Sequence, residues 1–131
     1  MNGLPSNELS RRVIGAAIEV HRSLGPGLLE SAYEKCLCRE LSLQEVPFEK
    51  QQELPVEYKG EKLDCGYRLD ILVDGRLIVE LKAVDTVTNL HKAQLMTYLK
   101  LLDCELGLLI NFNVPKLMNG VSRVSMGAPN L

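Results

Sequence analysis

The feature that most constrains the fold is the nearly uninterrupted apolar run LGLLINF at residues 106–112. Apolar residues at consecutive positions, rather than at alternate ones, are typical of a strand that is covered on both faces. Helical patterns occur in the N-terminal third of the chain and again directly before the run. The sequence therefore predicts an α/β (α+β) domain with a mixed central β-sheet flanked by α-helices.

Hydrophobic periodicity gives the order of the elements. Apolar residues recur every three or four positions in three segments, which predicts helices at 7–24, 28–43 and 89–102, the last with Asn89 as its N-cap. Between 47 and 84 the period changes to two, which predicts an antiparallel meander. The expected strands cover 48–58, 62–64, 67–73, 77–83, 106–112 and 121–125.

A length of 131 residues is enough for one hydrophobic core, whereas two cores of half that size would each be too small to be stable. We therefore expect one domain over residues 1–131, with a loose C-terminal tail at about 127–131. No segment approaches the roughly 20 consecutive apolar residues that cross a bilayer, and the N-terminus lacks the pattern of an export signal. The expectation is a cytoplasmic protein without a membrane partner, whose four cysteines are reduced thiols in or near the core.

The charge balance argues against nucleic-acid binding through bulk positive charge. Fifteen Lys and Arg against seventeen Asp and Glu give a formal net charge of -2. A polyanionic partner would therefore need a local basic patch, or divalent cations that neutralise an acidic site.

The candidate chemistry lies on two consecutive predicted strands. Glu80 and Lys82 are two residues apart on one strand, so both side chains leave the same face. Asp70 lies on the preceding strand, across a turn at Asp74-Gly75. A two-residue turn would place the two acids on opposite faces. A loop of three or five residues, with Gly75 in a left-handed or bulge conformation, brings Asp70 and Glu80 together, and we predict such a loop.

Two carboxylates at one place repel each other unless a cation lies between them. Mg²⁺ prefers oxygen ligands, so Asp70 and Glu80 are candidate metal ligands. Lys82 would then orient or deprotonate the attacking water and offset charge on a phosphate. This combination predicts metal-dependent hydrolysis of a phosphodiester. The alternative is a ladder of surface salt bridges between the same acids and nearby basic residues.

Two predicted helices carry further polar side chains. His91, Gln94 and Tyr98 have the spacing that places them on one helix face, which can look onto the strand hairpin. Glu30 and Tyr33 lie on one side of the second helix, near its N-terminus. Each of three residues has an ordinary alternative: Glu30 as a favourable first-turn acid, Tyr33 as a half-buried core residue and His91 as a solvent-facing residue.

Together these residues resemble the signature of the PD-(D/E)XK nuclease superfamily, which has an acid on one strand and E-x-K on the next. Asp70 and the sequence ELK at 80–82 match it, although Leu69 stands where the superfamily name has Pro. The sequence QLMTY at 94–98 is similar to the Q-x-x-x-Y motif of the RecB-type branch. The sequence GLLESAY at 27–33 is similar to the motif that names the GxxExxY group.

The resemblance implies a restriction-endonuclease-like core and a Mg²⁺-dependent nuclease, in which Mn²⁺ can substitute. The helix acid is expected to complete the metal site, so the implied metal ligands are Glu30, Asp70 and Glu80. Lys82 joins these three as a catalytic residue. Arg68 binds phosphate or holds a carboxylate. The implied substrate is nucleic acid, DNA rather than RNA, and the residues assigned to its binding are Gln94, Tyr98, Tyr33, His91 and Arg68.

Two other functions stay open. One is a catalytically inactive nuclease-fold module that binds nucleic acid or a protein partner, and the other is an assembly subunit whose acids only form salt bridges. Metal ions should stabilise the nuclease or the inactive module, but not the assembly subunit, so this measurement distinguishes the assembly subunit from the other two. A homodimer is compatible with an exposed edge strand, or with the first helix and its Arg11 and Arg12.

Overall fold

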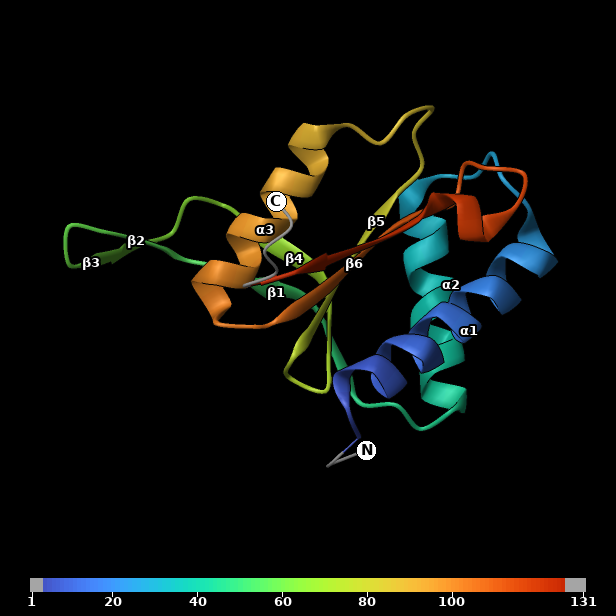
Figure 1. Ribbon diagram of the computed structural model, residues 1–131, viewed down its shortest axis with the longest axis horizontal. Helices are drawn as coiled ribbons and strands as arrows, with labels where there is room; N and C mark the ends of the chain where they lie inside the picture. The colour runs from blue at the N-terminus through green and yellow to red at the C-terminus, as the bar shows by residue number, and fades with distance from the viewer. Residues whose placement is uncertain (1–3, 127–131) are drawn as a thin grey trace.

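The computed structural model describes residues 4–126, which form three layers (Figure 1). Helices α1 (Ser6–Leu24) and α2 (Glu30–Leu43) lie on one side of a central sheet, and α3 (Asn89–Leu102) lies on the other. This arrangement confirms the predicted mixed sheet flanked by helices. The predicted tail at 127–131 lies outside the described residues.

The central sheet has five strands in the order β1-β4-β5-β6-β7. Neighbouring strands are antiparallel except β5 and β6, which run parallel. A parallel pair needs a crossover connection, and α3 provides it. The strands are β1 (Phe48–Glu53), β4 (Arg68–Val73), β5 (Leu77–Lys82), β6 (Leu106–Asn111) and β7 (Val121–Ser125), and a short 3-10 helix, η1 (Leu117–Gly120), precedes β7.

A two-stranded arm projects away from the body of the protein (Figure 1). It consists of β2 (Val56–Tyr58) paired with β3 (Glu61–Leu63). The sequence predicted one strand over 48–58, but Pro55 has no backbone N–H to donate and lies between β1 and β2. The predicted meander is therefore interrupted, because β1 pairs with β4 and the arm is inserted between them.

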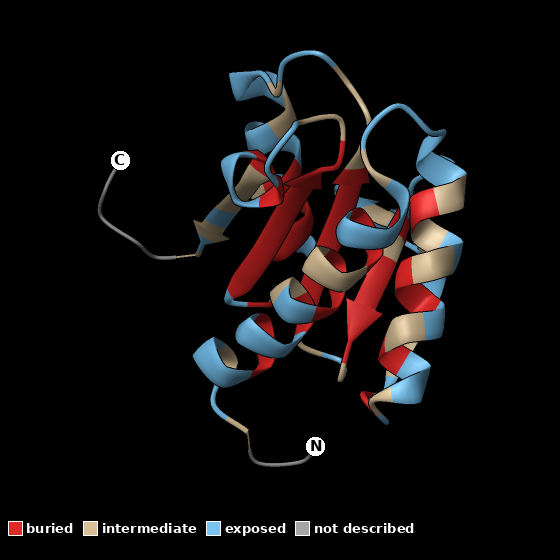
Figure 2. Ribbon diagram, turned by 90° about the vertical axis from the view of Figure 1, so that its right-hand side faces the viewer, coloured by how far each residue is buried: buried red, intermediate tan, exposed pale blue. Residues whose placement is uncertain are grey.

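Apolar side chains pack on both faces of the sheet, and Figure 2 shows the buried residues concentrated in the strands and on the inner faces of the helices. Strand β6 contributes buried side chains to both faces of the sheet. Leu108 and Ile110 belong to the cluster with α1 and α2, whereas Leu109 belongs to the cluster with α3. All six residues of β6 are buried, which confirms the prediction made from the apolar run.

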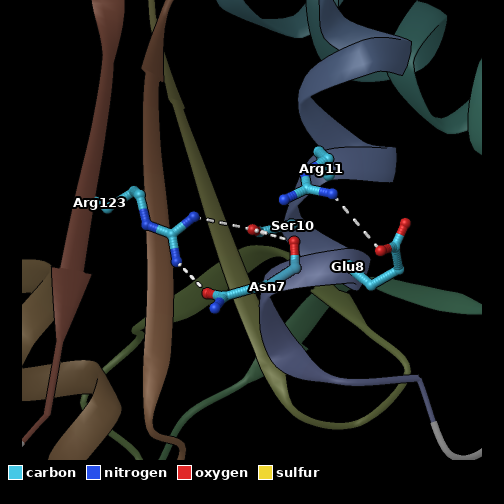
Figure 3. A network of polar contacts seen from close by, with 5 residues as sticks. All are labelled: Asn7, Glu8, Ser10, Arg11 and Arg123. Atoms are coloured by element: carbon cyan, nitrogen blue, oxygen red, sulfur yellow. Dashed lines mark hydrogen bonds and ion pairs between the residues drawn. The ribbon is translucent and has the colours of Figure 1, made fainter.

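Polar contacts fasten β7 to the start of α1 (Figure 3). The Arg123 guanidinium donates to Oγ of Ser10 (3.0 Å) and to Oδ1 of Asn7 (2.7 Å). Ser10 is fully buried and donates to the carbonyl oxygen of Asn7 at 3.0 Å. The neighbouring pair of Arg11 and Glu8, 3.6 Å apart, is exposed and contributes little. The ends of the described chain are therefore joined by side-chain hydrogen bonds as well as by packing.

The positions of the cysteines test the expectation that all four lie in or near the core. The four cysteines are free thiols, and Cys38 and Cys104 are buried as predicted. Cys65 is exposed, which corrects the expectation that all four lie in or near the core. Its segment lies between the projecting arm and β4. Within residues 4–126, no helix combines the length and the apolar character needed to cross a membrane.

Among the glycines of residues 4–126, Gly120 should tolerate a side chain least. A Cβ at this position would collide with the backbone carbonyl oxygen of Asn111, and a backbone atom cannot rotate away. Gly15, in α1, is the control because nothing lies within 4 Å of its Cβ position. Urea unfolding should show that Gly120→Ala lowers the free energy of unfolding by about 1–3 kcal/mol or more. Gly15→Ala should raise it by about 0.5–1 kcal/mol. Equal losses in both variants would contradict this account.

Candidate functional site

The hairpin of β4 and β5 sets the relative position of the two strand acids. Its loop comprises residues 74–76, so it has three residues. Asp74 and Gly75 have φ angles of 53° and 67°, in the left-handed region that glycine adopts without steric cost and aspartate tolerates. These features confirm the predicted odd-numbered loop. Continuing the strand register places Asp70 opposite Glu80.

Asp70 and Glu80, called here the carboxylate pair, bridge the two strands by reciprocal hydrogen bonds. The backbone N–H of Asp70 donates to Oε2 of Glu80 (2.9 Å), and the N–H of Leu81 donates to Oδ2 of Asp70 (2.8 Å). The regular pairing of β4 with β5 extends only as far as Ile71 and Val79. The carboxylates therefore take over as acceptors where the pairing ends. The second oxygen of each has no hydrogen bond to a described residue and is not sealed off from solvent.

Burial raises the pKa of both carboxyl groups of the pair. Glu80 is only 7% exposed, and burial followed by the charge of Asp70 raises its pKa to about 8. Burial also raises the pKa of Asp70, against the lowering effect of the hydrogen bond from Leu81. The charge of Lys82 opposes both shifts without cancelling them. Near neutral pH the carboxylate pair therefore favours a bound proton or a bound cation.

The donor chemistry of the pair fits a hard divalent cation, because both groups offer carboxylate oxygens. Among residues 4–126, however, no three His, Cys, Asp or Glu side chains are grouped closely enough to hold a metal ion. The predicted set of Glu30 with Asp70 and Glu80 is therefore not assembled as a three-ligand group. The group is not assembled because Glu30 lies exposed in the first turn of α2. Mg²⁺ sites commonly use one or two carboxylates and keep several waters, which two acids can satisfy.

Helix α2 brings two acids near Asp70. Glu30 begins the helix and Glu34 lies one turn later on the same side. The charges of both raise the pKa of Asp70, and Glu34 contributes more than Glu30. Nε2 of Gln51, on β1, donates to the two carboxylate oxygens of Glu34 at 3.0 and 3.1 Å. The sequence analysis missed Glu34 and Gln51, and the four-residue spacing from Glu30 was the signal that could have indicated Glu34.

His91, Gln94 and Tyr98 line one pocket of about 590 Å³, called here the α3 pocket, which confirms their shared helix face. Tyr67, which sequence analysis did not single out, forms another wall. Its ring meets that of Tyr98 at 60°, with centroids 6.2 Å apart. Burial raises the pKa of the Tyr98 hydroxyl, and so do the charges of the carboxylate pair. Tyr98 therefore lines the α3 pocket and feels the charges of the carboxylate pair, and it packs in one cluster with Leu69, the neighbour of Asp70.

Tyr33 lies in the core instead of facing a substrate. It is fully buried, and its ring stacks on Phe112 with centroids 4.4 Å apart. Its hydroxyl donates to the carbonyl oxygen of Gly25 (2.5 Å) and accepts from the N–H of Leu28 (3.1 Å). The predicted contact with substrate is therefore corrected, because no surface of Tyr33 is available for it. Its hydroxyl instead fixes the loop that leads into α2 and Glu30.

His91 has a structural partner at the start of α3. Nδ1 of His91 accepts from the backbone N–H of Thr88 (3.1 Å), and Oγ1 of Thr88 accepts from the N–H of His91 (3.3 Å). This reciprocal capping box satisfies two backbone donors at the helix start. Thr88, and not the predicted Asn89, is therefore the N-cap.

Arg68 contacts acidic side chains. Its Nη1 lies 3.8 Å from Oε2 of Glu53 and 3.9 Å from Oδ1 of Asp64, and it donates to the carbonyl oxygen of Tyr67 at 3.0 Å. The side chain is 42% exposed, so these ion pairs are weak. The geometry matches the second of the two predicted roles, the contact with a carboxylate.

Asn111 is a buried polar residue that the sequence analysis treated only as part of the apolar run. Its side chain donates to the carbonyl oxygen of Val84 (2.9 Å) and accepts from the N–H of Val84 (3.1 Å). It lies beside Lys82 in the register of β5 and β6. Asn111 therefore anchors the chain directly after the strand that carries Glu80 and Lys82.

Residues 7–124 match the family model described as the PD-(D/E)XK nuclease superfamily. The matched segment contains the carboxylate pair, Lys82, both α2 acids and the α3 pocket. No curated protein and no solved structure matches the chain significantly.

The stability of the metal-free protein should fall as pH rises, because of Glu80. Between about 4.5, where an ordinary glutamate ionises, and about 8, the folded protein holds a proton that the unfolded chain has lost. Rising pH then favours unfolding, by at most about 1.4 kcal/mol per pH unit. In Glu80→Gln this titration is absent, while the amide oxygen can still accept from the N–H of Asp70.

Denaturant unfolding in EDTA at about pH 5 and about pH 8.5 measures the effect. Glu80→Gln should lose less stability between the two pH values than the wild type. Glu49→Gln, at an exposed position of β1, is the control and should follow the wild type. Identical pH profiles for the wild type and Glu80→Gln would refute the raised pKa.

Proposed function

Because the chain belongs to the PD-(D/E)XK nuclease superfamily, we propose that it is a metal-dependent nuclease that hydrolyses phosphodiester bonds at the carboxylate pair. The observation that carries this proposal is the pair of reciprocal hydrogen bonds that fixes Asp70 beside Glu80. A surface salt-bridge ladder does not account for the arrangement. Neither acid has an ion-pair partner within 4.0 Å in the described part of the chain.

The proposed roles follow from the positions of the side chains. Asp70 and Glu80 hold Mg²⁺, or Mn²⁺ in its place, through their carboxylate oxygens. The bound cation supplies positive charge that offsets the charge of the phosphate in the transition state. Lys82 lies close enough to lower the pKa of both acids, and its Nζ orients the attacking water and takes or returns a proton. Glu30 adds a third acid near Asp70.

The proposed substrate is DNA, approached from the side of α3. Gln94 and Tyr98 contact it from the middle of the helix, and His91 from the first turn. With a formal net charge of -2, the chain depends on the bound cation rather than on bulk charge to meet a polyanion. A homodimer, a cytoplasmic location and membership of the GxxExxY group stay predictions.

A second candidate is a nuclease-fold module that binds nucleic acid or a protein partner without cleaving. The observation that favours it is the lack of a ready three-ligand group among residues 4–126. A member of a catalytic fold can lose turnover while keeping the fold and the binding surface. The two candidates differ in turnover and share the binding surface.

Cleavage of labelled single-stranded DNA, duplex DNA and RNA with Mg²⁺ or Mn²⁺ tests the first candidate. Asp70→Asn and Lys82→Ala should each lower the cleavage rate by about 10²–10⁴-fold, as expected for loss of a metal ligand or of a proton-transfer group. Lys100→Ala, which removes an exposed lysine from the last turn of α3, is the control and should leave the rate unchanged. Cleavage that persists without a divalent metal, or in both site variants, would refute the assignment.

Mg²⁺ should also raise the melting temperature of the wild type, and by more at about pH 8.5 than at about pH 5.5. The reason is that the cation and protons compete for the carboxylate pair, whose pKa values are raised. The double variant Asp70→Asn/Glu80→Gln should show no such rise in thermal melts. A metal-dependent rise without cleavage would favour the second candidate, and neither rise nor cleavage would refute a metal site.

A further inference from the structure

The side chains that line the α3 pocket have no role in the proposed cleavage step itself. Tyr67 and Val56 line it on one side, and residues of α3 line it on the other. None of its described lining residues is Asp, Glu, Lys or Arg. The pocket therefore offers no fixed charge to a phosphate group. Its volume of about 590 Å³ and its neutral walls suit an uncharged, flat group instead.

Tyr67 presents a fixed aromatic ring at this pocket. The side chain is 44% exposed, and the edge contact with Tyr98 restricts the ring. The backbone is also held, because the carbonyl oxygen of Tyr67 accepts from the N–H of Leu54 (3.0 Å) and from Arg68 (3.0 Å). A half-exposed ring that is already ordered can stack on a nucleobase with little further loss of entropy.

Neutral polar groups around the pocket complement the edge of a base. The amide of Gln94 can both donate and accept. The hydroxyl of Thr97 donates to the carbonyl oxygen of Ala93 (3.1 Å) and keeps its capacity to accept. Tyr98 lines the pocket and packs in the same buried cluster as Leu69, the neighbour of Asp70 on β4. A base in the α3 pocket would therefore bring its own backbone phosphates near the acids.

We propose that the α3 pocket binds one unpaired nucleobase, stacked on Tyr67, and that the substrate class is therefore single-stranded nucleic acid, including single-stranded ends. This inference rests on the proposed function and specifies its substrate. A base within a duplex is paired and stacked, so it must be extruded at an energetic cost before it reaches such a pocket.

Binding of a fluorescein-labelled oligothymidylate to the full chain tests the inference, with Asp70→Asn as the common background so that turnover does not consume the probe. Tyr67→Ala should weaken binding about 5- to 150-fold, the range for loss of one base-stacking contact. Tyr67→Phe keeps the ring and should bind within about twofold of the background. A blunt duplex of the same length should bind at least about tenfold more weakly than the single strand.

Tyr58→Ala is the matched control. Tyr58 is a more exposed tyrosine, at 60%, on the arm itself, and it does not line the α3 pocket. This variant should bind the oligonucleotide within about twofold of the background, whereas a nonspecific aromatic effect would weaken both alanine variants alike. Thermal melts verify folding, and if Tyr67→Ala does not fold, Tyr67→Leu, which fills space but cannot stack, should show the same loss of binding.

Three results of the binding and sedimentation measurements would overturn the inference. They are equal binding by the alanine variants of Tyr67 and Tyr58, binding of the duplex as tightly as the single strand, and a Tyr67-dependent change in sedimentation mass, which would mean that a second copy occupies the pocket. Binding that depends on Tyr67 while the wild type cleaves nothing would refute the nuclease and keep the inference. Metal-dependent cleavage that is indifferent to Tyr67→Ala would keep the nuclease and refute the inference.

Discussion

Two hydrogen bonds connect β4 and β5 at the point where their regular strand pairing ends. Strands that separate leave backbone N–H groups without acceptors, and an unpaired buried donor is costly. Here the side chains of Asp70 and Glu80 supply the missing acceptors, each to the strand of the other. The same contacts prevent the two acids from moving apart to relieve their repulsion. β4 and β5 can therefore diverge at this point and present a polar site while the sheet stays intact.

The electrostatics of the site follow from this constraint. The acids are held close, one of them is almost fully buried, and α2 adds the charges of Glu30 and Glu34 from one side. A single cationic side chain, Lys82, does not balance this negative charge. Because the imbalance is built into the backbone positions, a side-chain rotation cannot remove it. A proton or a metal ion can, and this is the physical basis for the proposed cofactor.

The sequence was sufficient wherever a single local rule decided the structure. The apolar run at 106–112 indicated a strand covered on both faces, and Gly75 together with the need to align the acids indicated an odd-numbered loop. Spacing on α3 placed His91, Gln94 and Tyr98 on one face. Each of these features depends on neighbours within a turn or a hairpin, where periodicity and glycine chemistry are informative.

The sequence was insufficient wherever several local solutions compete or distant segments meet. Thr88 and Asn89 are both good N-caps, and the reciprocal bond with His91 selected Thr88. Tyr33 could have faced a substrate or the core, and its ring stacks on Phe112, a residue far along the chain that the sequence does not place beside it. The contact of Gln51 with Glu34 could not be predicted, because only the fold brings β1 beside α2.

The carboxylate pair also has a consequence for the order of folding. Its two hydrogen bonds join residues only 10 and 11 positions apart. By contrast, the parallel pairing of β5 with β6 must enclose all of α3 before it forms. Contacts between near neighbours in sequence cost less loop-closure entropy and tend to form sooner. The acids can thus be set side by side in a nascent hairpin, before the fold around them exists. The later docking of α2 and α3 then brings helices to a pair of acids whose spacing is already determined.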